Sequence, residues 1–129
     1  MSVNELQALA QQFADAFDQR DLKTVMGMLS EDVEVFDHVP YRFDGKQLFA
    51  KYLNEAVAPL VSASFGFRQP SCRVYGDIVG IVNAYDMFMG ATKEGKVRPI
   101  HGRTTLVFIK QSGRWKIVSA HFSAIPQAL

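Results

Sequence analysis

Two histidines and an arginine late in the chain have the chemistry to transfer protons or bind an anion. His101 and Arg103 lie in the segment 98–111, and His121 lies in the segment 114–124. Both segments are apolar-rich with alternating polar residues, as strands are, and the serine and glycine between them favour a tight turn. Because histidine changes its charge near neutral pH, His121 would transfer the proton while Arg103 held a carbonyl or an anion.

The register of this hairpin decides whether these side chains meet. We place Lys110 opposite Arg114. In that register Arg103 pairs with His121, and His101 pairs with the serine two residues later, so that all lie on one face. The strip then either binds a ligand or forms a polar seam, at a dimer interface or in solvent. The sequence leaves both interpretations open.

Neither a metal ion nor another cofactor is expected. His38, His101 and His121 lack the short spacing that metal ligands usually have, and nothing requires any two of them to share a cavity. The chain also lacks a glycine-rich phosphate loop and a nucleophile-elbow motif. Cys72, the single cysteine, is predicted to be a buried apolar residue rather than a nucleophile.

Helices are predicted in the first half of the chain. Ser2 and Glu5 form a capping-box pattern, and apolar residues then follow at helical spacing over 6–17. Asp21 is placed to cap a second, shorter helix. A third helix is expected to begin at Asp44 and to end before the proline at position 59.

Strands are predicted for the second half, where the apolar period changes from 3.6 to 2. After a short strand at 32–37, the expected strands are 62–69, 71–75, 77–89, 97–110 and 114–124, the first two joined by a bulge at Pro70. Tight turns between consecutive strands indicate a mostly antiparallel meander, and helices separate from strands indicate the α+β class. With no linker in view, we predict one domain spanning 1–129.

The segment 77–89 is apolar on both of its faces, with Val82 and Phe88 on one and Tyr85 and Met87 on the other. Three helices cannot cover both faces of the long sheet. A monomer rarely leaves a large apolar sheet face bare. We therefore predict a homodimer in which a second copy covers the outer face.

Composition excludes several partners. The formal net charge is +1, and the 14 basic residues are scattered among 13 acidic ones. Such a chain has no basic patch for nucleic acid and no apolar run long enough for a membrane helix. The single cysteine and the absence of a basic-then-apolar beginning favour a cytoplasmic protein without a secretory signal.

Two segments resemble the SnoaL-like proteins of the nuclear transport factor two and ketosteroid isomerase superfamily. They are the region from Arg20 to Asp37 and the closing hairpin, Gly113-Arg-Trp-Lys-Ile-Val-Ser-Ala-His-Phe-Ser. The order of elements matches over nearly the whole chain. The resemblance implies a cone-shaped, strongly curved sheet with three helices over its concave face and an apolar cavity. Known activities of members are ketosteroid isomerisation, polyketide cyclisation, dehydration and epoxide hydrolysis. Other members only bind, transport or assemble.

The resemblance also implies site residues. Asp37 stands where the isomerases carry a general base, although a short polar residue there could simply cap the end of a strand. Their oxyanion tyrosine lies on the first helix, and the matching position here is Phe13, which has no proton to donate. Tyr52, Tyr41 or Tyr85 would have to supply that donor.

Together these observations predict a protein that binds a small apolar or aromatic molecule and possesses residues for proton transfer of the isomerase, cyclase or lyase type. The candidate catalytic residues are Asp37, His121 and Tyr52. The candidate ligand-binding residues are Phe13, Tyr41, Tyr85, His101, Arg103 and Phe122. Whether a reaction is catalysed stays open.

The alternative is a non-catalytic association domain. The ending of the chain also resembles the association domain of calcium/calmodulin-dependent protein kinase, which uses this fold to assemble rings. The cavity arginines of that domain fall here at Leu106 and Phe122, so its charged pocket is not reproduced. A closed ring in solution would favour this alternative, and a dimer with an open cavity would favour ligand binding.

Overall fold

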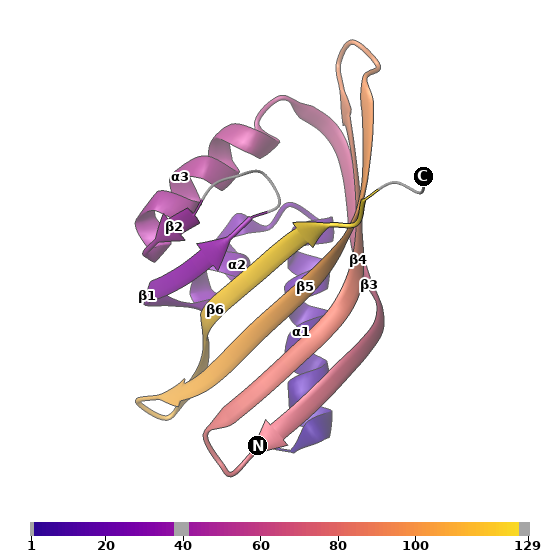
Figure 1. The fold of residues 1–129 in the computed structure, drawn as a ribbon. Coiled ribbons are helices and arrows are strands. Elements are labelled where there is room, and N and C mark those ends of the chain that lie inside the picture. Colours follow the sequence, from indigo (N-terminus) through magenta and orange to yellow (C-terminus); the bar gives the residue numbers. More distant parts are fainter. Residues whose placement is uncertain (1, 38–41, 127–129) are drawn as a thin grey trace.

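A curved sheet with helices against one face makes up the fold (Figure 1). The computed structural model describes residues 2–37 and 42–126. The helices are α1 (Val3–Asp18), α2 (Leu22–Met28) and α3 (Lys46–Val57). The strands are β1 (Leu29–Phe36), β2 (Arg42–Asp44), β3 (Leu60–Tyr75), β4 (Val79–Thr92), β5 (Val97–Gln111) and β6 (Arg114–Ala124). The six strands lie in the order β2-β1-β6-β5-β4-β3, and only the β1–β6 pair is parallel. The predicted α+β class and mostly antiparallel sheet are confirmed.

The first two helices begin as their sequences predict. The backbone N–H of Glu5 donates to the Ser2 hydroxyl over 3.1 Å, and the Glu5 carboxylate accepts from the Ser2 N–H, which completes the capping box. At α2, the Asp21 carboxylate accepts from the N–H of Thr24 over 3.2 Å. Side-chain oxygens thus satisfy N–H groups that a helix start would otherwise leave unpaired.

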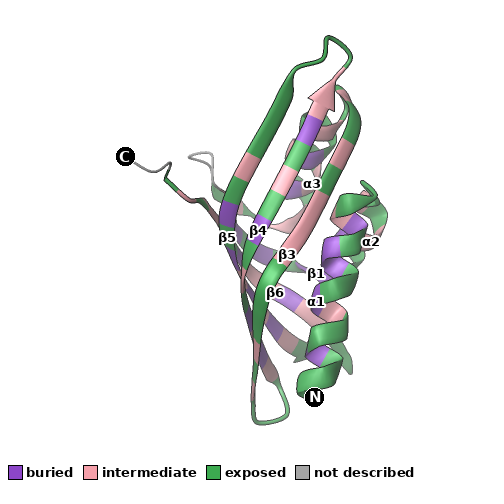
Figure 2. Cartoon of the chain, turned by 90° about the vertical axis from the view of Figure 1, so that its right-hand side faces the viewer, coloured by how far each residue is buried: buried purple, intermediate pink, exposed green. Residues whose placement is uncertain are grey.

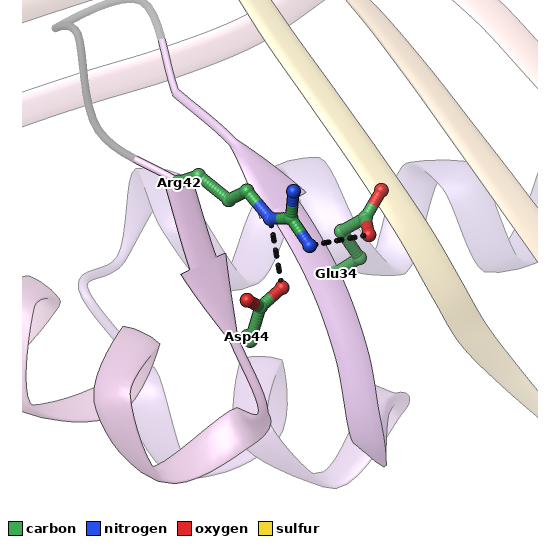
Figure 3. A network of polar contacts seen from close by, with 3 residues as sticks. All are labelled: Glu34, Arg42 and Asp44. Atoms are coloured by element: carbon green, nitrogen blue, oxygen red, sulfur yellow. Dashed lines mark hydrogen bonds and ion pairs between the residues drawn. The ribbon is translucent and has the colours of Figure 1, made fainter.

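The predicted start of the third helix was wrong. Its N-cap is Gly45, with no side-chain hydrogen bond, and Asp44 instead ends the short strand β2. There Arg42 lies 3.0 Å from Asp44 and 3.4 Å from Glu34 of β1, as Figure 3 shows. Asp44 is therefore engaged by a cross-strand ion-pair network. The pKa of Arg42 is raised by the hydrogen bond that Arg42 donates to Asp44 and by the negative charges of Asp44 and Glu34.

The edge strand β3 is long and carries the predicted bulge. Segments 62–69 and 71–75 are one strand, with a register shift between Arg68 and Ser71 where Gln69 takes a φ of 51°. The carboxylate of Asp18, at the end of α1, accepts from the N–H of Phe65 over 2.9 Å. The opposite edge of the sheet is β2, which is three residues long.

The core lies between the helices and the concave face of the sheet. Its largest fully buried side chains include Phe13, Phe49 and Phe108. Along α1, exposed positions alternate with buried ones at helical spacing, so that one side of the helix packs against the sheet (Figure 2). None of the helices in the described part of the chain is long and apolar enough to cross a membrane.

The closing hairpin has a different register from the predicted one. Gln111 pairs with Arg114 because Ser112 and Gly113 take φ values of 50° and 77°, typical of a two-residue turn. A second shift follows after Phe108, so Arg103 pairs with Ser123 rather than with His121. The two one-residue shifts add up to two, and the side chains therefore keep the predicted common face.

Candidate functional site

A largely apolar cavity of about 480 Å³ lies between the helices and the sheet. Its apolar lining comes from the ends of α1 and α2, from α3 and from the concave face of the sheet: Phe17, Leu22, Phe49, Leu53, Phe65, Phe88, Ile100 and Phe122. A cavity of this size and character can enclose a small organic molecule. Of the candidate ligand-binding residues within the described part of the chain, Phe122 borders this cavity.

Two of the predicted catalytic residues border this cavity. Asp37 directly follows β1 and is half-buried there. Tyr52 lies on α3, with its ring centroid 4.7 Å from that of Phe43 and 6.4 Å from that of Phe49. These aromatic contacts hold the Tyr52 ring at the cavity wall.

A second carboxylate, which the sequence analysis missed, lines the same cavity. Asp86 of β4 is 6% exposed and accepts a short hydrogen bond from the hydroxyl of Thr104 on β5. Among the described residues, the buried polar or charged ones are Ser30, Asp86 and Thr104, so two of the three form this pair. A carboxyl group costs free energy to bury, and hydrogen bonds offset part of that cost.

Glycine at position 102 makes room for the Asp86 carboxylate. A Cβ at Gly102 would lie 2.8 Å from Asp86 Oδ1 and 2.8 Å from the backbone oxygen of Ser123. Both distances are too short for a real side chain. The β4–β5 pairing therefore depends on glycine opposite Asp86. The sequence contains a feature that could have identified Asp86, since it is the acidic member of an alternating series that otherwise consists of apolar residues, Val82, Ala84 and Phe88.

The structure does not bring the other predicted catalytic residue to the cavity. His121 lies on the outer face of the sheet, exposed, with its ring centroid 5.8 Å from that of Phe36. His101, Arg103 and Tyr85 are also exposed on that outer face, Arg103 being the cross-strand partner of Tyr85. Their side chains alternate with those that point inward, such as Thr104 and Asp86.

The two remaining candidates have different outcomes. Phe13 is fully buried, and its ring lies parallel to those of Phe67 and Phe122 at 6.1 and 6.4 Å. It packs behind the cavity wall and does not border the cavity. Tyr41 lies outside the described residues. Within residues 2–37 and 42–126, no three His, Cys, Asp or Glu side chains lie close enough together to hold a metal ion.

A family model described as a SnoaL-like domain matches residues 6–127. No curated protein matches the chain. Among solved structures, a proposed dehydratase of the NTF2-like family from Streptomyces avermitilis is 15% identical with a TM-score of 0.84, over 97% of this chain and 97% of its own. A proposed scytalone dehydratase from Novosphingobium aromaticivorans is 13% identical with a TM-score of 0.81, over 96% of this chain and 87% of its own.

A third similar structure is a proposed calcium/calmodulin-dependent protein kinase II association domain from Xanthomonas campestris. It is 19% identical with a TM-score of 0.85, over 99% of this chain and 91% of its own. At such identities these likenesses establish the fold. They include proteins named for catalysis and proteins named for assembly, so the choice of function rests on the cavity and the surface of this chain.

Proposed function

Because the chain belongs to the SnoaL-like domain family, we propose that it binds small, largely apolar or aromatic molecules in the cavity between its helices and its sheet. The observation that carries this proposal is the cavity of about 480 Å³, apolar over most of its wall and bordered by a few polar groups. Apolar walls supply most of the affinity in such a site, and the polar groups orient the ligand.

The chemistry that we propose is proton transfer of the isomerase, cyclase or lyase type. Two carboxylates border the cavity in different surroundings, since Asp86 is buried and bonded to Thr104 whereas Asp37 is half-buried. Such a pair can divide the work, one group removing a proton from carbon and the other returning it. Tyr52 is the candidate hydrogen-bond donor to an oxygen of the substrate. His121 has no part in this proposal because it lies on the outer face.

Ligand binding is tested by thermal unfolding against steroids, aromatic polyketides and terpenoid epoxides. A ligand that binds only the folded chain stabilises it by about 2.7 kcal/mol at a hundredfold excess over its dissociation constant. We expect one class to raise the midpoint, and D86N, D37N or Y52F to change that shift. D77N, in the exposed β3–β4 turn, is the matched control. If no class shifts the midpoint and no turnover of the same compounds is seen, the proposal fails.

We further propose that a second copy of the chain covers the outer face of the sheet. Because side chains alternate between the two faces along β4, this strand places Tyr85, Met87 and Met89 on the outer face, where they are 42%, 38% and 41% exposed. Phe36 of β1 is 39% exposed on the same face. Packing of this patch against the same patch of a second copy would give a twofold dimer. The similarity to proteins named as kinase association domains supports association through this fold.

Size-exclusion chromatography with light scattering tests the association. We expect the mass of a dimer at micromolar concentration. A monomer would contradict the dimer without touching ligand binding, because the cavity is lined by one chain. A large closed ring would favour the assembly function over the catalytic one.

A further inference from the structure

The inner-face pairs of β4 and β5 change in character along the cavity. Moving towards the hairpin that joins the two strands, the successive pairs are Asp86 with Gly102, Phe88 with Ile100, and Gly90 with Arg98. All of these except Gly102 border the cavity. A buried carboxylate is thus followed by an apolar stretch, and the apolar stretch is followed by a cation.

The cationic end contains more than one positive charge. Arg98 and Lys96 come from the hairpin, and Arg20 comes from the connection between α1 and α2. Arg20 is held in place by a hydrogen bond from its guanidinium to the backbone oxygen of Leu60, over 2.9 Å. The hairpin turn also contains Lys93 and Glu94, which do not border the cavity.

The carboxylates that border the cavity come from elsewhere. Asp37 follows β1, and Asp86 lies in the middle of β4. Strands rise about 3.4 Å per residue, so the four residues from Gly102 to Arg98 span roughly 14 Å. Figure 1 shows the hairpin reaching beyond the other strands at this end of the sheet. One cavity therefore has an acidic group and cationic residues at positions well separated along the strands, with an apolar stretch between them.

We propose that the ligand of this cavity is an apolar organic anion, an aromatic or alicyclic acid whose anionic group binds at Arg98 and Lys96. Its ring system lies along Phe88 and Ile100, and its other end reaches Asp86. This inference rests on the proposed function of the cavity and specifies the class of ligand. Arginine and lysine bind carboxylates by charge-assisted hydrogen bonds, while Asp86 disfavours the reverse orientation.

Two fluorescent probes of almost the same shape test the charge preference. 1-Anilinonaphthalene-8-sulfonate is an apolar anion, and N-phenyl-1-naphthylamine is its neutral counterpart. We expect the anion to bind more tightly, to lose affinity as salt screens the cations, and to displace the neutral probe. R98Q and K96Q should each weaken the anion roughly two- to fivefold, as exposed charge pairs do, and leave the neutral probe unchanged.

The matched control is R114Q, an exposed arginine next to the β5–β6 turn at the far end of β5. It should change neither titration. Equal affinity for both probes, unaffected by R98Q and K96Q, would overturn the anion preference and leave the binding cavity standing. Binding of the neutral probe without the anion would also overturn the anion preference, and failure of both probes to bind would count against the cavity itself. Binding without mutual displacement would place the anion outside the cavity and would also overturn the inference.

Discussion

The two faces of one sheet differ in what they offer, although the same strands build both. On β5, Thr104, Leu106 and Phe108 are buried against the helices, while His101 and Arg103, which precede them on the strand, are exposed on the other face. The inner face forms a core and a cavity with one buried carboxylate. The outer face combines apolar and titratable side chains, and no helix of the described residues covers it. Parity along the strand thus decides whether a residue faces the cavity and core or the outer surface.

Core packing should give the largest difference between the faces. Phe108 is fully buried, whereas its neighbour Val107 points outward and is half-buried. F108A should lower the free energy of unfolding by about 3–5 kcal/mol because it leaves a cavity in the core. V107A should cost about 1 kcal/mol or less. Urea unfolding measures both, and equal losses would show that the two faces are packed alike.

Adding one methyl group to a glycine should destabilise the protein on the inner face of the sheet but not on the outer face. G102A would force a Cβ to within 2.8 Å of Asp86 Oδ1, so we expect a loss of about 1–3 kcal/mol from overpacking, together with weaker ligand binding.

G66A on the outer face of β3 is the matched variant, since nothing lies within 4 Å of its added Cβ. It should leave stability within about 1 kcal/mol of wild type, or raise it, because alanine restricts the unfolded chain. Thermal unfolding compares the pair. Equal destabilisation would mean that the close approach of Asp86 to β5 is not what requires glycine.

A charge on the outer face should separate the two copies without harming the fold. M87K would bury an unpaired ammonium in the proposed interface, and we expect the dimer dissociation constant to rise at least tenfold, or about 1.4 kcal/mol. I78K is the control, because Ile78 is exposed in the β3–β4 turn. Light scattering over a concentration series reads out both. An unchanged dimer in M87K would place the association elsewhere.

The smallest difference concerns a thiol. Cys72 points inward opposite Val82, and burial raises its pKa from the ordinary 9.0. The thiolate is the reactive form, so iodoacetamide should alkylate Cys72 roughly a few fold more slowly than a free thiol. The alkylation rate should also begin to rise at a higher pH than it does for a free thiol, because the pKa of Cys72 is raised. A cysteine placed at the exposed neighbour Arg73, with Cys72 changed to serine, should react faster at every pH. Equal rates would show that the inner face is open to solvent here.

Much of the fold could be predicted from local patterns. The capping box at Ser2, the bulge before Ser71 and the bounds of β6 all follow from residues close in sequence. The start of α3 did not, because Asp44 is engaged by Arg42 and Glu34, and only the β1–β2 pairing brings these together. The hairpin register depended on a turn type and a bulge that alternation alone does not specify.

The candidate site could be predicted only in part, because alternation along a strand shows which residues share a face but not which face the helices cover. Alternation placed His121 and Arg103 on one face, but it could not tell that the helices pack on the other. Asp86 was overlooked because the inward series of β4 was identified by its apolar members alone. An acid in such a series is informative only once the direction of burial is known. Asp37 and Tyr52 came from family resemblance, and both border the cavity.

The bond from Phe65 to Asp18 has a consequence for how copies of the chain can meet. It occupies one of the outward N–H groups of β3, Pro70 has none to offer, and the bulge at Gln69 twists the strand out of line. A foreign strand therefore finds no continuous template on this side, and β2 is too short to provide one on the other. Both margins of the sheet are therefore poor templates for edge-to-edge pairing, which directs contacts between copies towards the apolar outer face.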